Sequence, residues 1–381
     1  MEWKVPLADV QLGVEEILAV EQVLRSGWLT MGEVTQAFEQ EFEVFTGARH
    51  ALAVTNATAG LHMACVAVGV GPGDEVILPA LTFVASANAI CFTGAQPVFA
   101  DIESTDWLCI APSSIERAIT PRTKAIMVVH YSGFACDMPA ILEIAKQHGL
   151  AVIEDAAHAV GASLEGQALG TWGDVGVYSF FGNKNLTTGE GGMVVTNDNK
   201  LAAKLGILRS HGMTTLTWDR HKGHASTYDV VDFGYNYRID EMRSALGREQ
   251  LKKLPAGNTR RGELVGLYRD LLAELVPEVK VPFQEERGVS SYHIMAVLLP
   301  EGTDKLGLME AMKAQRIQTS WHYPPVHTFT AFKDGRNWSD ALLLTEAIAK
   351  REMTLPLYPG MRDEQVKLVV EALKESLADV D

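Results

Sequence analysis

The chain has 381 residues, of which 47% are hydrophobic, and this length exceeds the span of a single hydrophobic core. We therefore expect two domains. The formal net charge of −15 argues against nucleic acid or an anionic membrane as the main partner, because both bind through a basic face that neutralises phosphates.

The first part of the chain alternates helical and extended patterns. Two helices open it, Val14 to Ser26 and Val34 to Phe45, and a glycine follows shortly after each. Short apolar strands then alternate with helices, which predicts an α/β fold with a mostly parallel sheet and helices on both faces. The expected strands are 50–55, 75–78, 97–100, 125–129 and 151–154, and the expected helices between them are 58–70, 84–91, 113–119 and 138–148.

The pattern changes after Gly173. Two apolar runs, 175–180 and 193–196, leave no room for a helix between them and predict an antiparallel pair. A polar stretch at 218–226 predicts an exposed loop. A long helix, 239–254, is expected to end before Pro255, where we place the boundary between a large domain, 1–255, and a smaller α/β domain, 256–381. The smaller domain should hold a strand at 293–299 and helices at 305–315, 341–350 and 363–378.

The cysteines and the start of the chain bear on location. The four cysteines include no C-x-x-C pair, and no basic leader with a following apolar stretch opens the chain. No run approaches the roughly 20 apolar residues of a membrane helix. We therefore expect a reduced, cytoplasmic protein.

One lysine and one aspartate carry the chemistry. Lys184 lies in the glycine-rich stretch Ser179 to Gly192, twenty-nine residues after Asp155, which ends an apolar run. A lysine amine forms a Schiff base with an aldehyde, and a buried carboxylate keeps a pyridine nitrogen protonated, so the pair predicts pyridoxal 5'-phosphate (PLP) as cofactor. Most lysines are solvated surface charges, but a site between two strands with glycines on both sides is uncommon for one.

A phosphate site is expected at the segment Asn56-Ala-Thr-Ala-Gly60, between a strand and a helix. The amides of Thr58 and Ala59 there would face an anion with the helix dipole behind them, and Ser179 could add a hydroxyl. The alternative is an ordinary helix cap by Thr58.

Two further residues have open roles. Phe83 follows a strand and could stack on the pyridine ring, or simply belong to the core. His158, three residues after Asp155, could lie by the ring hydroxyl, be a satisfied polar residue, or bind a metal. Neither H-E-x-x-H nor clustered Cys and His occurs, so we expect no metal. The sequence also lacks the nucleophile-elbow, phosphate-loop and dinucleotide-binding motifs of other enzyme classes.

With these residues in place, the chain resembles the DegT/StrS family of sugar aminotransferases, within the fold type I PLP enzymes related to aspartate aminotransferase. The resemblance covers nearly the whole length and rests on several motifs together. They are Gly71 to Val76, Pro79 to Val84, Ile153 to Ala157, Ser179 to Gly192, Gly234-Tyr-Asn-Tyr-Arg238, His322-Tyr-Pro324 with His327, and Leu355 to Pro359.

The resemblance implies a set of cofactor roles. Lys184 would carry the Schiff base and Asp155 would pair with the ring nitrogen. The remaining implied cofactor residues are Thr58, Ala59 and Ser179 for phosphate, Phe83 for the ring face, His158 near the ring hydroxyl, and Asn236, which would reach the phosphate in the neighbouring subunit of a homodimer.

The resemblance also implies the reaction. L-glutamate, the usual donor, would give its amino group to a 3- or 4-keto-6-deoxyhexose linked to a nucleotide, with Lys184 moving the protons. Relatives that act as dehydratases carry a histidine in place of the lysine, so Lys184 favours transamination. Candidates for holding the sugar and nucleotide are Arg238, His322, Tyr323 and His327. The alternatives are a keto-inositol aminotransferase and a PLP-binding regulator without turnover.

Overall fold

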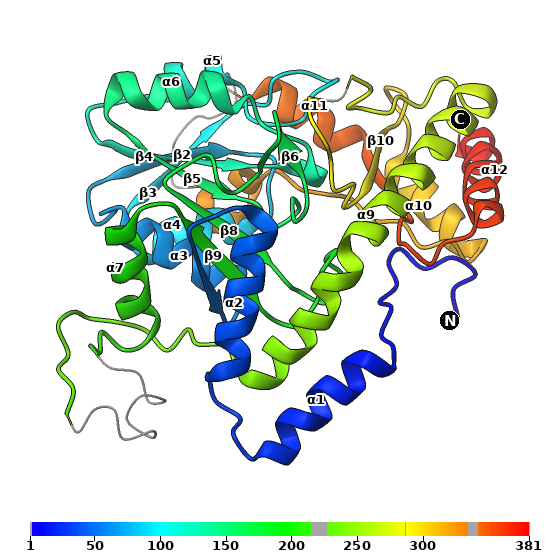
Figure 1. Ribbon diagram of the computed structural model, residues 1–381. Helices are drawn as coiled ribbons and strands as arrows, with labels where there is room; N and C mark the ends of the chain where they lie inside the picture. The colour runs from blue at the N-terminus through cyan, green and yellow to red at the C-terminus, as the bar shows by residue number, and fades with distance from the viewer. Residues whose placement is uncertain (1, 215–226, 286, 334–341, 381) are drawn as a thin grey trace.

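The computed structural model describes residues 2–214, 227–285, 287–333 and 342–380 (Figure 1). Its centre is a seven-stranded sheet in the order β1-β9-β8-β5-β4-β2-β3. β9 runs antiparallel to both β1 and β8, and the other neighbouring strands are parallel. The predicted α/β sheet and its antiparallel pair are therefore confirmed. The strands are β1 (His50–Val54), β2 (Glu75–Pro79), β3 (Gln96–Ala100), β4 (Thr123–Val129), β5 (Ala151–Asp155), β8 (Val175–Ser179) and β9 (Gly192–Thr196).

Helices cover both faces of this sheet (Figure 1). Successive side chains of a strand point to opposite faces, and the core divides accordingly. In β4, Ile126 and Val128 belong to one apolar cluster, while Ala125 and Met127 belong to another. The first cluster includes residues of α2 (Glu33–Thr46), α5 (Pro112–Ala118) and α6 (Met138–His148), and the second includes residues of α3 (Ala57–Ala67), α4 (Val84–Phe92) and α7 (Asn199–Arg209).

The C-terminal part of the chain builds a third apolar cluster together with Val5. A two-stranded antiparallel sheet, β10 (Met295–Leu298) and β11 (Glu352–Leu355), lies there. The helices of this C-terminal part are the second half of α9 (Glu241–Leu275), α10 (Lys305–Ala314), α11 (Leu343–Arg351) and α12 (Asp363–Val380). The expected strand at 293–299 is thus shorter than predicted, and His293 lies just before it.

The predicted end of the long helix at Leu254 is wrong. α9 continues through Pro255 for another twenty residues. A proline removes one helical hydrogen bond, and the apolar side chains that α9 buries on both sides of it, Leu251 and Leu254 before and Leu264, Val265 and Leu272 after, offset that loss. Before the proline, Lys253 pairs with Glu16 of α1 (Val14–Ser26), and after it Arg260 pairs with Asp363 of α12. The proposed domain boundary falls inside this helix, and the two-domain division stays a prediction.

Several short elements carry no sequence signal that we used. These are α7, β11, a small hairpin of β6 (Ser163–Leu164) and β7 (Gln167–Ala168), and three 3-10 turns at Tyr131–Gly133, Val326–Thr328 and Thr330–Phe332. The polar stretch 218–226 and position 341, the expected start of a helix, lie outside the described residues. Among the helices that are described, none combines the length and the apolar character needed to cross a bilayer.

Candidate active site

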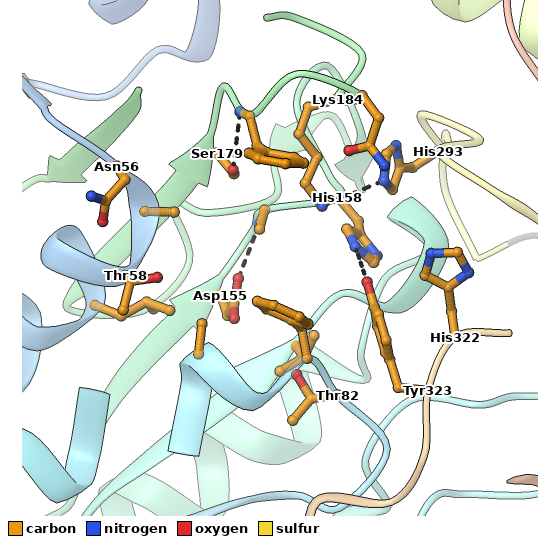
Figure 2. Close-up of a pocket in the computed structure, with 18 of the residues that line it drawn as sticks. Asn56, Thr58, Thr82, Asp155, His158, Ser179, Lys184, His293, His322 and Tyr323 are labelled. Carbon is orange, nitrogen blue, oxygen red and sulfur yellow. Dashed lines mark hydrogen bonds between the residues drawn. The ribbon is translucent and has the colours of Figure 1, made fainter. Parts of the chain in front are cut away.

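A cavity of about 550 Å³ opens where strands of the central sheet end (Figure 2). β1, β2, β4, β5 and β8 run in the same direction, so their carboxyl ends meet at one edge, where ligands of open α/β sheets bind. The cavity brings together eight of the residues predicted from the sequence. They are Thr58, Phe83, Asp155, His158, Ser179, Lys184, His322 and Tyr323.

Asp155 ends β5 and is held by two hydrogen bonds. Ser86 Oγ donates to Asp155 Oδ2 at 2.7 Å, and the Ala157 N–H donates to Oδ1 at 3.1 Å. Burial raises the pKa of the Asp155 carboxyl, while these two hydrogen bonds and the charge of Lys184 oppose that rise. The depressed pKa that a protonated pyridine would cause therefore has to come from the ring itself, because the chain alone does not produce it.

Lys184 lies on the turn after β8, where its N–H donates to Phe181 O at 2.9 Å. Burial lowers the pKa of the Lys184 amine to about 8, and the charge of Asp155 acts in the opposite direction. A pKa in this range gives a substantial fraction of neutral amine near neutral pH, which a nucleophilic lysine requires. Lys184 Nζ lies 3.4 Å from Nε2 of His293, a residue that the sequence analysis did not select.

A glycine lets β9 pass close to the start of α3. A Cβ on Gly192 would lie 2.8 Å from Tyr178 O and 2.9 Å from the Ala57 nitrogen. Both distances are shorter than real Cβ contacts, so any residue with a Cβ at this position would force the backbone of β9 or of the start of α3 to move. The strand, the helix start and the lysine loop can therefore approach one another only around a glycine.

The amino end of α3 forms the wall opposite the lysine and matches an anion site. Ala57 and Thr58 are its first two residues, so their N–H groups have no carbonyl partner within the helix, and both residues line the cavity. The Ala59 N–H differs from expectation, because Asn56 Oδ1 already accepts it at 2.8 Å and Ala59 does not line the cavity. Ser179, at the end of β8, also lines the cavity.

The donors and rings present fit PLP. Free amides and the Ser179 hydroxyl suit a phosphate, the Asp155 carboxylate suits a protonated ring nitrogen, and Lys184 suits an aldehyde. Phe83 is 56% exposed at the cavity wall, so its ring face is available for stacking.

His158 is held as a neutral imidazole. Its Nδ1 accepts the Ser132 N–H at 3.2 Å, so the proton is on Nε2, which donates to Tyr323 Oη at 3.0 Å. Burial lowers the pKa of His158 well below its usual value, and the Lys184 charge acts in the same direction. The Tyr323 hydroxyl can then donate its proton to another acceptor. Tyr323 lines the cavity, as Figure 2 shows.

His322 lines the same side of the cavity. Its backbone N–H donates to Glu352 Oε2 at 2.7 Å, and its Nδ1 lies 2.8 Å from Thr354 Oγ1. Burial lowers the pKa of His322 to about 4. His322 and Tyr323 thus both line the cavity, and their role in holding the sugar and nucleotide stays a prediction.

Four predicted residues do not line the cavity in the single chain, Ala59 and the three that follow. His327 packs against Phe99, with ring centroids 6.3 Å apart, and its Nε2 lies 3.1 Å from Glu346 Oε1. Asn236 and Arg238 lie on the segment beside β1, where Asn236 forms a bridge with Ser210. A substrate role for His327 has no support in this geometry, while roles for Asn236 and Arg238 require another chain.

Known proteins resemble this chain in both sequence and fold. The model of the DegT/DnrJ/EryC1/StrS aminotransferase family matches residues 10–374. The chain is 42% identical over 376 residues to the spore coat polysaccharide biosynthesis protein SpsC of Bacillus subtilis, covering 97% of this chain and 96% of SpsC. It superimposes on DesV of S. venezuelae, solved with a ketimine intermediate, with a TM-score of 0.91, 34% identity and full coverage of both chains, 100% each. Spr1654 of Streptococcus pneumoniae in its PLP-form gives a TM-score of 0.91 at 28% identity, with 100% of both chains covered.

Proposed function

The chain belongs to the DegT/DnrJ/EryC1/StrS aminotransferase family and is a PLP-dependent sugar transaminase, and we propose that it aminates a nucleotide-linked keto sugar. The donor would be L-glutamate, and the acceptor a 3- or 4-keto-6-deoxyhexose, so that the product is an amino sugar. The name of SpsC, a polysaccharide biosynthesis protein, supports a role of the product in a surface polysaccharide. The observation that carries the proposal is the meeting of Lys184, Asp155 and the amino end of α3 at one cavity.

PLP, when bound, supplies an aldehyde carbon for the lysine amine and a ring that withdraws electrons from the substrate. Asp155 would hold the ring nitrogen, with Ser86 and Ala157 keeping its two oxygens in place. The Ala57 and Thr58 amides and the Ser179 hydroxyl would hold the phosphate. Phe83 would cover one face of the ring.

Lys184 carries the proton transfers in this proposal. Once its amine is free, it takes the proton from the α-carbon of the donor and later returns a proton to the sugar carbon. The pKa of about 8 lets the amine act in both directions near neutral pH, because it gains and loses a proton there with little cost.

The other face of the cavity suits a polar acceptor. Tyr323 presents a hydroxyl oriented by His158, and His322 presents an imidazole oriented by Thr354. Both groups would hydrogen-bond sugar hydroxyls.

We also propose a homodimer with shared sites. The phosphate is a dianion in a chain with a net charge of −15, so it needs several donors, and one chain supplies only part of them. Asn236 is exposed at the surface, and an exposed Phe233 lies three residues before it. Asn236 and Arg238 would complete the phosphate and substrate site of the partner.

The proposal is tested by turnover. The purified chain with PLP, L-glutamate and a panel of nucleotide-linked 3-keto and 4-keto sugars should give an amino sugar, detected by mass. A keto-inositol in the same panel tests the alternative acceptor. If none of the nucleotide-linked keto sugars is aminated, or if only the keto-inositol is, the proposed acceptor is wrong.

A further inference from the structure

His293 connects the lysine to the part of the chain that follows the long helix. It lies 109 residues after Lys184, just before β10, and is 5% exposed. Its Nε2 lies 3.4 Å from Lys184 Nζ, and both side chains line the cavity (Figure 2). A neutral imidazole can face an amine either with a lone pair or with an N–H, so the effect of His293 depends on which nitrogen carries its proton.

Asn185 decides where that proton is. His293 Nδ1 lies 2.9 Å from Asn185 Oδ1, an oxygen that can only accept, so Nδ1 carries the hydrogen. His293 Nε2 then has a lone pair, and this lone pair faces Lys184. Asn185 is the residue next to Lys184 in the chain, so the lysine and its histidine are positioned by neighbouring residues.

The orientation of the Asn185 amide is itself determined by two acceptors. Its Nδ2 donates to Ser291 O at 2.7 Å and to Asn258 Oδ1 at 2.8 Å. Asn258 is oriented in turn, because its own Nδ2 donates to Val160 O at 3.0 Å. A reversed Asn185 amide would point its oxygen at a carbonyl, so the network admits one arrangement.

We propose that His293 is the positioning residue of Lys184. Its neutral imidazole accepts a hydrogen bond from the amine through Nε2 whenever that amine is free, that is, not joined to the cofactor by a C=N bond. The proposal rests on the proposed function, because it concerns the lysine that this function uses. It adds a role for the Asn185, Asn258 and Ser291 network, which keeps the lone pair of His293 toward the amine.

The surroundings keep His293 neutral. Burial lowers its pKa well below the usual value, and the positive charges of Lys184 and Arg261 act in the same direction. Arg261 Nη1 donates to His293 O at 3.2 Å, and the His158 ring lies 4.3 Å from the His293 ring, measured between centroids. The titratable groups that face this pair are Asp155, His158, Glu190, Arg261, His322 and Tyr323.

The test uses two amide replacements of the same histidine. His293→Asn keeps a donor for Asn185 but is too short to reach Lys184, and His293→Gln places an amide oxygen near the former Nε2. The readout is the condensation of Lys184 with PLP added to the full-length, cofactor-free protein, in which a C=N bond forms and one water leaves. Its rate is followed by absorbance as a function of pH.

The wild-type rate should rise as Lys184 loses its proton. An accepted hydrogen bond favours the charged amine, so its loss in His293→Asn should move the midpoint of the pH profile down by about one unit, while His293→Gln should stay close to the wild type. Asn185→Leu should shift the midpoint in the same direction as His293→Asn, because the His293 proton can then move to Nε2.

Equal midpoints for wild type, His293→Asn and Asn185→Leu would overturn this inference. Circular dichroism and thermal unfolding check that each variant is folded. His293→Asn and His293→Gln have side chains of similar polarity, so the midpoints of their pH profiles can be compared with each other even if both variants are less stable than the wild type. Borohydride reduction and peptide mapping locate the bond to PLP. A wild-type bond at another lysine, or none, would contradict the proposed function itself and is therefore distinguishable from a failure of the role of His293.

Discussion

Ser86 Oγ donates a 2.7 Å hydrogen bond to Asp155 Oδ2, and Thr82 Oγ1 lies 2.9 Å from the same hydroxyl. The start of α4 therefore orients the carboxylate at the end of β5. The sequence analysis selected Asp155 and the segment containing Thr82 but missed Ser86, which lies in the first turn of α4. A buried carboxylate oriented in this way can hold a ring nitrogen without rearrangement.

The first prediction concerns Lys184. The protein with PLP should be yellow, borohydride should link the cofactor to this residue, and Lys184→Ala should lower transamination at least about a thousandfold, because both the nucleophile and the proton carrier are lost. The assay is 2-oxoglutarate release from L-glutamate. Lys200→Ala, at an exposed position of α7, is the control and should be unaffected. Normal turnover of Lys184→Ala would end the proposal.

The second prediction concerns Asp155. Asp155→Asn keeps hydrogen-bonding atoms for Ser86 but cannot hold a proton on the ring nitrogen, so the half-reaction with L-glutamate should slow about a hundredfold or more. Stopped-flow absorbance measures this rate. Thermal unfolding should change little. If the half-reaction kept its rate, Asp155 would not contact the ring nitrogen.

The third prediction concerns Gly192. Gly192→Ala places a Cβ against Tyr178 O and the Ala57 nitrogen, which must move the amino end of α3 or β9. We expect PLP affinity to fall about tenfold or more, measured by absorbance titration of the cofactor-free protein. Gly71→Ala is the matched control, because a Cβ there meets nothing within 4 Å. Equal affinities of the two variants would show that the close approach at Gly192 does not shape the phosphate site.

The fourth prediction concerns the buried carboxyl of Glu352, whose pKa burial raises from 4.5 to about 8. Folding then favours the protonated form, so the free energy of unfolding contributed by Glu352 should decline as the pH rises from about 4.5 to about 8. Glu352→Gln cannot ionise and should gain stability relative to wild type over this window, by up to about 3 kcal/mol. Urea unfolding at pH 5 and pH 8 measures the difference.

The same unfolding experiment has a control in Glu364→Gln, at an exposed position of α12, which should show no such trend. A stability difference between Glu352→Gln and wild type that does not change with pH would mean that the Glu352 carboxyl has the same pKa in the folded and the unfolded chain.

The fifth prediction concerns the shared site. Lys184→Ala and Asn236→Asp chains should each be inactive as homodimers, and the second change places a negative charge near the partner's phosphate. After dissociation and reassociation of a 1:1 mixture, about a quarter of the wild-type activity should return, because half the dimers are mixed and each has one intact site. Mixed dimers are counted by native mass spectrometry. Their presence without any activity, or a fully active monomer, would rule out a shared site.

Much of the fold, and many of the residues expected to bind the cofactor, could be predicted because the sequence patterns that indicate them are local. Each parallel strand is a short apolar run, and the residues at its end must meet the ends of its neighbours, so Asp155, Ser179 and the start of α3 could be expected together. Lys184 was found through the glycines around it. The structure explains one of them, Gly192, since a Cβ at that position would collide with two backbone atoms.

The tertiary structure decided what depends on residues far apart in the sequence. His293 reaches Lys184 from 109 residues away, Tyr323 reaches His158 from 165 residues away, and neither pairing has a period or a spacing that a sequence displays. The protonated nitrogen of each histidine follows from a partner in another element. The course of α9 past Pro255 follows from packing against α1 and α12. Local patterns specify strands, helices and the residues at their ends, whereas hydrogen-bond partners and helix ends also depend on the free energy of contacts that exist only after the chain has folded.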